Sequence, residues 1–170
     1  MADPEVLRRL VGKALLARQQ SLLKTYFGTT QLVLASGGTE HVAHFTRGHF
    51  RSHDDAFCLE IDMANAFNEI SRNAIRATLV REFPCMLPLF DLCHQGPSTV
   101  HFGGHNLVCN EGVFQGDTLG PVYFCLGMHP TVTQLQDQHP WLVTKYYMDD
   151  GRILGRRNQI PLGSAMATVL

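Results

Sequence analysis

The sequence predicts an α+β domain in which helices pack on one face of an antiparallel sheet. Three observations favour this class. Segments with helical spacing of apolar residues alternate with short β-prone runs. The β-prone runs in the second half are joined by turn signals short enough for antiparallel hairpins. Of the 170 residues, 45% are hydrophobic and 17% are charged, which is enough apolar material for one domain with a core.

The first predicted element is a helix that begins at Pro4 and ends before Gly28. Asp3 is a suitable N-cap, and proline is favoured at the first helical position. The basic residues of this helix are interpreted as a solvated face. The helical spacing itself is carried by an apolar stripe made of Leu7, Leu10, Val11, Ala14 and Leu15.

A second, shorter helix is expected after Thr39, its candidate N-cap, with Val42 and Phe45 facing inward. The polar segment 51–55 then predicts a break in regular structure. The sequence FCLEID, residues 57–62, follows as a strand that becomes buried.

Ser71 is the candidate N-cap of a helix that contains Ile75, Leu79 and Val80 and ends before a proline. A further short helix is expected at residues 87–93.

The pair Gly103-Gly104 between two β-prone runs predicts a two-residue hairpin, and Gly112 and Gly116 bracket a loop. A buried helix is expected at residues 119–136. A strand at 141–147, a turn at Asp149-Asp150 and a returning strand at 152–154 complete the prediction.

Composition excludes several classes of protein. The five cysteines are odd in number and form no CxxC pair, which argues against a disulfide framework and a zinc knuckle. No apolar run is long enough to span a bilayer, and the N-terminus lacks the apolar core of a signal peptide. An intracellular protein that binds no membrane is therefore expected. The formal net charge of −1 argues mildly against nucleic-acid binding, which usually leaves a basic footprint.

Three aspartates, two of them adjacent in the sequence, are candidates for a metal-binding site. Asp62 ends one β-prone run, and Asp149 and Asp150 occupy a hairpin turn 149 − 62 = 87 residues later. Taken alone, each is more often a cap or a turn former. If neighbouring strands bring them together, however, their mutual repulsion needs cations, and oxygen ligands of this kind suit magnesium. Two such ions could activate a hydroxyl and stabilise a leaving phosphate.

Three motifs give these acids a context. The sequences IDMANAFNEISR, EGVFQGDTLGPVYF and YYMDDG resemble, in order, the three palm motifs of reverse transcriptases of the non-long-terminal-repeat retrotransposon kind. The upstream segments VLRRLVGKALLA and GGTEHVAH also resemble those that precede the first motif in that family. The resemblance covers roughly residues 5–155.

The resemblance implies a role for individual residues. Asp62 and Asp149 would be the principal metal ligands, Asp150 the third acid, and the backbone carbonyl of Met63 a further oxygen ligand. Phe67 would pack under the incoming sugar and exclude a 2′-hydroxyl. The remaining matches are expected to contact nucleotide, template or primer, and they are Gln115, Gly116, Tyr147 and Met148.

The family also implies a fold, cofactors and partners. Residues 1–55 would be partial fingers with connecting helices, 56–158 a palm with an antiparallel sheet, and 159–170 a truncated tail without a thumb. Two Mg²⁺ ions, with Mn²⁺ as an alternative, would support DNA synthesis from deoxynucleoside triphosphates on an RNA template and a DNA primer.

Two departures from the family pattern limit this expectation. Thr118 stands where the family usually has proline. The segments that would supply the remaining fingers, the primer grip and the thumb are not matched in the chain, so this chain alone is expected to be weakly active or inactive. A catalytically dead remnant and a non-catalytic nucleic-acid-binding module remain open alternatives. An RNA-templated RNA polymerase is disfavoured, because Phe67 would block ribonucleotides.

Overall fold

The computed structural model describes residues 4–114 and 116–159. Its contacts divide the chain into two compact units. The helical unit comprises Met1–Tyr26 and Ala64–Pro130, and the sheet unit comprises Phe27–Met63 and Thr131–Leu170. The division predicted at residues 55 and 158 stays a prediction, and the predicted tail lies outside the described residues except for its first position.

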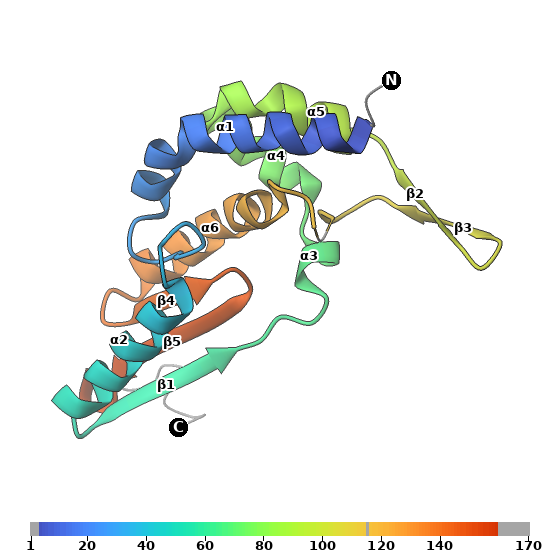
Figure 1. The fold of residues 1–170 in the computed structure, drawn as a ribbon. Helices are drawn as coiled ribbons and strands as arrows, with labels where there is room; N and C mark the ends of the chain where they lie inside the picture. The colour runs from blue at the N-terminus through green and yellow to red at the C-terminus, as the bar shows by residue number, and fades with distance from the viewer. Residues whose placement is uncertain (1–3, 115, 160–170) are drawn as a thin grey trace. The chain divides into compact units, whose positions relative to one another are not determined.

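The helical unit holds most of the helices and one β-hairpin (Figure 1). The hairpin has Gly103 and Gly104 at its turn, both with positive φ (57° and 80°), as a tight two-residue turn requires. The elements of this unit are α1 (Pro4–Phe27, up to Tyr26), α3 (Ala66–Glu69), α4 (Arg72–Glu82), the 3₁₀ turn η1 (Pro84–Met86), α5 (Leu87–His94), β2 (Ser98–Phe102), β3 (His105–Cys109) and the first part of α6 (Gly120–Gln138).

The core of the helical unit is built from one side of α1, α4 and α5 and from all sides of the first part of α6, where residues 122–129 are all buried. Ser71 caps α4 as predicted, because its hydroxyl accepts a hydrogen bond from the Ala74 backbone N–H at 3.4 Å. Val80 is exposed, in contrast to its predicted helix neighbours. The side chains that are almost fully buried are Leu23, Ile75, Leu79, Met86, Phe90, Leu119, Tyr123, Phe124 and Leu126.

Helix α1 spans the predicted residues, but the predicted stripe is wrong about which side is buried. Leu7, Leu10 and Val11 are 56%, 63% and 45% exposed. Gly12 is buried instead, and a Cβ at this position would lie 3.4 Å from the Thr118 side chain. The missing side chain lets the opposite side of α1 approach its neighbours, which leaves the apolar stripe outside.

The sheet unit contains a three-stranded antiparallel sheet with the order β1-β5-β4. Its elements are α2 (Gly38–Ser52), β1 (Ala56–Ile61), β4 (Val143–Tyr147), β5 (Asp150–Arg156) and the short 3₁₀ turn η2 (Arg157–Gln159). Figure 1 shows α2 beside the strands. The central strand β5 pairs with both neighbours, so that it fixes the register of the whole sheet.

Helical segments pack on both faces of this sheet, so the prediction of one covered face is wrong here. Ile153 packs with Phe57 and Leu142, and Leu135 of α6 lies against this cluster. The next residue along β5, Arg152, points to the opposite face. There its guanidinium donates to the Thr46 hydroxyl of α2 at 3.4 Å.

Three local expectations in this unit also need correction. Helix α2 begins at Gly38 rather than after Thr39, and its N-cap is Gly37, whose left-handed backbone (φ 64°) suits glycine. Phe45 is 39% exposed rather than inward, and β1 is not buried along its length, since Leu59 is 44% exposed.

Most other elements agree with their predicted type and place. The loop between Gly112 and Gly116 and the helix after it are confirmed, and both glycines have positive φ. The final turn is shifted by one residue, because Met148 and Asp149 form it and Asp150 already belongs to β5. Within the part of the chain that the structure describes, no helix combines the length and apolar character that a membrane crossing requires.

Gly151 is predicted to be essential for the sheet. A Cβ there would lie 2.2 Å from the Tyr146 ring on the paired strand. We expect Gly151→Ala to lower the free energy of unfolding by about 1–3 kcal/mol, as overpacking does elsewhere. Urea denaturation followed by circular dichroism measures this loss.

Gly48→Ala is the matched control in the same unit. This helical position has nothing within 4 Å of a built Cβ, so alanine should stabilise α2 by about 0.5–1 kcal/mol. Equal unfolding midpoints for the two variants would contradict the packing argument.

Candidate functional site

The turn between β4 and β5 is held by a buried amide. The Gln31 side chain, 4% exposed, donates from Nε2 to the Met148 carbonyl at 3.1 Å. Its Oε1 accepts from the Met148 backbone N–H at 3.0 Å. Met148 has φ 57°, an unfavourable backbone conformation for a residue with a side chain. The two hydrogen bonds therefore stabilise a turn that the local sequence alone would not favour.

The backbone around Gln31 reinforces the same turn. Tyr146 donates its backbone N–H to the Thr30 carbonyl at 2.7 Å, and its carbonyl accepts from Leu32 at 2.8 Å. Gln31 thus forms an isolated parallel bridge with Tyr146 at the outer edge of β4. The acidic turn is tied to a segment 117 residues earlier in the sequence.

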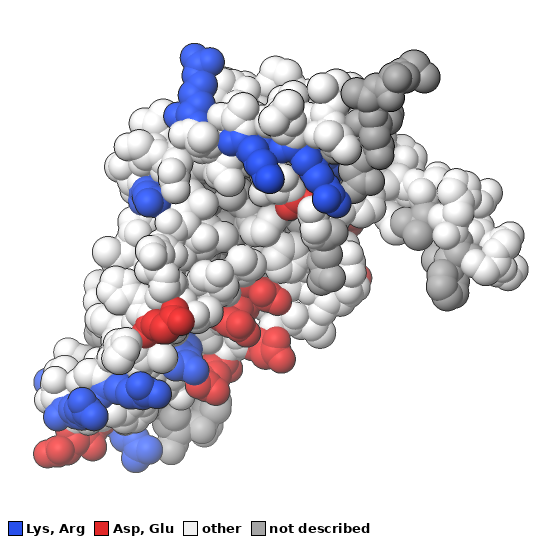
Figure 2. Space-filling model, in the orientation of Figure 1, with Lys and Arg blue, Asp and Glu red and all other residues white. Residues whose placement is uncertain are grey.

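Asp62 and Asp150 lie next to each other by strand register. Ile61 is the Cα partner of Gly151 across the antiparallel pair β1–β5. One further step along each strand places Asp62 opposite Asp150. Both side chains belong to exposed residues, and Asp149 comes directly before Asp150 in the turn. Figure 2 shows acidic side chains gathered near the end of β1 and this turn.

An open cavity of about 400 Å³ lies at this edge of the sheet, within the sheet unit. Asp62 and Asp150 both line it, and Tyr147 contributes from β4. The first turns of α2 form the other wall through Thr39, Val42 and Ala43. The cavity can therefore present two carboxylates and an aromatic ring to a bound molecule.

Two basic side chains lie on the same face of the sheet, two residues further along the strands from the acids. Arg152 lines the cavity and pairs with Glu60 of the neighbouring strand at 3.1 Å. Lys145, the register partner of Arg152 on β4, is 8% exposed, and its Nζ donates to the Thr29 carbonyl at 2.5 Å. Burial lowers the pKa of Lys145. The face thus combines a row of carboxylates with a row of basic groups.

The carboxylates suit magnesium in type but do not form a complete ligand cage. Over residues 4–114 and 116–159, no group of three or more His, Cys, Asp or Glu side chains is placed to hold a metal ion. Mg²⁺ is, however, commonly held by one or two carboxylates together with waters and substrate phosphates. Asp62 and Asp150 on one cavity meet that smaller requirement.

Phe67 and Gly116, two of the other predicted site residues, belong to the helical unit. The Phe67 ring stacks on Phe124 with a centroid distance of 4.7 Å and an interplanar angle of 17°. Gly116 is exposed with φ 88°. Gln115 lies outside the described residues, and the roles predicted for Met63, Phe67 and Gly116 stay predictions.

Backbone contacts join the first two sequence motifs inside the helical unit. Val113 donates its N–H to the Phe67 carbonyl at 2.8 Å, and Gly112 donates to the Ile70 carbonyl at 2.9 Å. A Cβ at Gly112 would lie 2.4 Å from the Asn68 carbonyl oxygen. Glycine is therefore required for this close approach, which fixes the start of the loop that carries Gly116.

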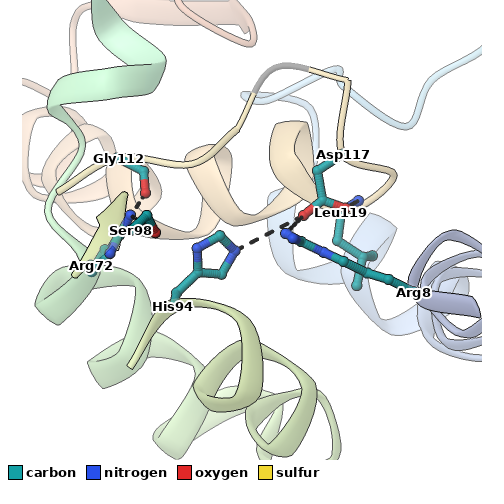
Figure 3. Close-up of polar contacts among 7 residues, drawn as sticks. All are labelled: Arg8, Arg72, His94, Ser98, Gly112, Asp117 and Leu119. Atoms are coloured by element: carbon teal, nitrogen blue, oxygen red, sulfur yellow. Dashed lines mark hydrogen bonds and ion pairs between the residues drawn. The ribbon is translucent and has the colours of Figure 1, made fainter. Parts of the chain in front are cut away.

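A charged side chain anchors the other end of that loop. Asp117 pairs with Arg8 of α1 at 2.5 Å, and its second oxygen accepts from the Leu119 backbone N–H at 3.3 Å. Figure 3 shows His94 of α5 on the other side of this carboxylate, with Nε2 3.9 Å from it. Burial, followed by the nearby Arg8 and Arg72 charges, lowers the pKa of His94 to about 4.

Arg72 forms a second buried anchor in the same unit. Its guanidinium donates to the carbonyls of Gly112 and Gly96 at 2.9 Å and to the Ser98 hydroxyl at 3.2 Å. Figure 3 shows the Gly112 contact beside His94. Arg72 therefore connects the loop after β3 to the segment before β2.

Sequence reasoning missed Gln31, Arg152 and the Arg8–Asp117 pair. No local signal marks Gln31, since its partner is remote in sequence. The alternation of β5 could have placed Arg152 on the same face as Asp150, because residues two apart on a strand share a face. The Asp117 anchor stands within the QGD sequence, but its partner in α1 has no recognisable spacing.

The fold resembles parts of several solved telomerase structures. Apo telomerase from Candida tropicalis, truncated from the C-terminal domain, matches with a TM-score of 0.58 at 13% identity over 86% of this chain and 35% of that chain. Telomerase from C. tropicalis in complex with the TWJ fragment of telomeric RNA matches with a TM-score of 0.58 at 13% identity. The match covers 92% of this chain and 29% of that chain. Telomerase from Candida albicans in complex with the TWJ fragment of telomeric RNA matches with a TM-score of 0.52 at 12% identity. The match covers 86% of this chain and 30% of that chain.

These matches show a telomerase-like α+β fold. The chain spans about a third of the length of these telomerase chains. No protein-family model and no curated protein sequence matches it.

We expect the stability of the protein to fall as the pH drops from about 6.5 to about 4. In this window the unfolded chain binds a proton at His94 while the folded chain does not, so acidification favours unfolding. The contribution of one such group approaches about 1.4 kcal/mol per pH unit. Unfolding midpoints measured from pH 7 to pH 4 in wild type and His94→Gln test this.

The slope should be shallower in His94→Gln than in the wild type. The exposed His41→Gln is the matched control and should keep the wild-type slope. Identical slopes in all three proteins would show that His94 is not the titrating group.

Proposed function

We propose that the chain is the palm-containing part of a reverse transcriptase and contributes to RNA-templated DNA synthesis. The observation that carries the proposal is the placement of Asp62 and Asp150 side by side on one open cavity. The three motifs in family order and the telomerase-like fold support it. Telomerases are RNA-directed DNA polymerases, and two of the similar structures contain telomeric RNA fragments. RNA is therefore the first partner proposed for this chain.

In this proposal, the chain's own residues position the reacting groups. Gln31 holds the turn so that Asp149 and Asp150 have a fixed backbone. Strand pairing holds Asp62 beside them. Tyr147 lines the cavity, where it would contact the primer end together with Met148. Fixed geometry of this kind lowers the entropic cost of bringing a primer hydroxyl to a nucleotide phosphate.

Asp62, Asp149 and Asp150 would hold Mg²⁺, with Mn²⁺ as an alternative and the Met63 carbonyl as a further ligand. When bound, two such ions activate the attacking hydroxyl and stabilise the leaving phosphate. The carboxylates supply the negative charge that retains the ions, and the exposure of Asp62 and Asp150 leaves room for substrate phosphates to complete the coordination.

Further details of the proposal rest on the sequence motifs. Phe67 would select deoxynucleotides by blocking a 2′-hydroxyl, while Gln115 and Gly116 would lie against the nucleotide and the template. A non-long-terminal-repeat retrotransposon origin and a DNA primer belong to the same proposal.

A non-catalytic nucleic-acid-binding module is the second candidate. It is favoured by the lack, among the described residues, of a complete group of three metal-binding side chains. In this case Arg152, which lines the cavity, would bind a phosphate while the acids have no catalytic role.

We expect primer extension on an RNA template with Mg²⁺ to depend on the acidic residues. Asp62→Asn, Asp149→Asn and Asp150→Asn should each lower extension by about 10³-fold, because metal ions contribute several kcal/mol to such reactions. Gel-based extension of a labelled DNA primer measures this. Asp54→Asn is the matched control, since Asp54 is an exposed acid of the same unit that does not line the cavity.

Filter binding of the same RNA at low salt separates the two candidates. RNA binding without extension, unchanged in the three variants, would support the binding module. Extension that survives Asp62→Asn and Asp150→Asn would contradict the proposed catalytic site. A lack of RNA binding at low salt would contradict both functions.

A further inference from the structure

The apolar stripe of α1 is exposed although it has the spacing of a buried helix face. Leu7 and Leu22, at its two ends, are 56% and 60% exposed, and Val11 between them is 45% exposed. Positions 7, 11, 15 and 22 are apolar and, with Arg18 between the last two, follow the 3–4 residue spacing of one helix side over about 22 Å of α1. Such a stripe is the usual signature of a surface that another element covers.

Helix α5 and the 3₁₀ turn before it lie beside this stripe, and a groove runs between them and α1. An open cavity of about 470 Å³ lies between the two helical segments, within the helical unit. One wall is formed by residues 11, 14, 15 and 18, and the other by residues 85, 88, 89 and 92. Both sets have the spacing i, i+3, i+4, i+7, so each wall is two helical turns long. Leu92, at the end of the second wall, is 83% exposed.

The charged residues of α1 beside the groove are of one sign, whereas Asp91 on the α5 side is paired with Arg76. Between Val6 and Phe27 the sequence has five basic residues and no acidic one, and Figure 2 shows Lys and Arg side chains spaced along α1. Arg18 lines the groove itself. No ion pair involving Arg18 is found in the described part of the chain. A bound molecule with carboxylates beside its apolar residues would pack its apolar residues into the groove and pair its carboxylates with Arg18.

We propose that the groove between α1 and α5 binds an acidic amphipathic helix of a partner protein. Two walls, each with helical spacing, accept the apolar side of a third helix, in the way that helix-in-groove interfaces do. Carboxylates on the flank of that helix pair with Arg18, which fixes its orientation. This interaction is independent of nucleotide chemistry in the sheet unit.

Other occupants fit these observations less well. A second copy of the chain would bring two basic α1 helices together, and like charges across an interface are unfavourable. A flat bilayer does not fill a concave groove between two helices. RNA is held mainly by contacts between its phosphates and cations, whereas seven of the eight described residues that line this groove are uncharged.

Fluorescence anisotropy with two labelled peptides tests the proposal on the full 170-residue chain. The acidic peptide is a 15-residue helix with Leu at i, i+3, i+4 and i+7 and with Glu and Ala elsewhere. The basic peptide has Lys in place of every Glu. We expect the acidic peptide to bind at least tenfold more tightly than the basic one. Arg18→Glu should reverse this order, because the charge in the groove then has the opposite sign.

Variants at exposed positions locate the binding surface. Leu92→Glu should weaken binding of the acidic peptide at least tenfold, while Leu92→Met should retain it. Val108→Glu is the matched control, since Val108 is 61% exposed on the β2–β3 hairpin and does not line the groove. It should leave binding unchanged.

Three results would overturn the proposal. In the first, neither peptide binds. In the second, both peptides bind equally and Leu92→Glu has no effect. In the third, vesicles of phosphatidylcholine and phosphatidylserine (7:3) or a single-stranded RNA bind in a way that Leu92→Glu abolishes while the acidic peptide does not bind, which would assign the surface to lipid or nucleic acid instead.

Discussion

The candidate site depends on a buried side-chain amide that clamps a turn. Gln31 makes two hydrogen bonds to the backbone of Met148, one as donor and one as acceptor. Leaving either partner unsatisfied inside the protein would cost about 1–3 kcal/mol. A turn with a left-handed methionine is thus held in place by the sheet unit itself. The position of Asp149 and Asp150 follows from this constraint.

Strand pairing in the sheet places Asp62 beside the turn that Gln31 holds, so that the acids from two strands form one site. The central strand β5 begins at Asp150 and pairs with β1, whose end leads into Asp62. Gly151 allows the Tyr146 ring to cover the strand next to the turn. The acids therefore meet at the edge of a sheet whose register cannot slip by one residue without exposing Ile153 and turning Arg152 inward. Arg152 and Lys145 add positive charge one row away.

The sequence was sufficient for those elements whose determinants are local. The Gly103-Gly104 hairpin, the Ser71 cap and the strand before Asp62 carry their signals within a few residues. Other features were decided by remote packing. The buried side of α1 is selected by Gly12 against Thr118 and Leu119, and the first residue of α2 must be small because Gly38 lies against the Tyr147 ring. Periodicity alone identified the helix and misplaced its buried side.

The candidate site shows the same division. Asp62, Asp149 and Asp150 stand in recognisable motifs, so their sequence context was enough to select them. Gln31 could not be selected, because an amide that hydrogen-bonds across 117 residues leaves no pattern in its own segment. The exposed stripe of α1 shows the reverse case, in which a clear apolar pattern predicts burial that the described residues do not provide.

The most direct test of the account is paramagnetic relaxation by Mn²⁺ in ¹H–¹⁵N spectra of the full chain. We expect the backbone amides of Asp62 and Asp150 to broaden together, at the same low Mn²⁺ concentration. In Gln31→Met the broadening at Asp150 should require more Mn²⁺, because the turn is no longer clamped. Broadening at only one of the two acids in the wild type, or at neither, would contradict the claim that strand pairing and the Gln31 clamp create one shared cation site.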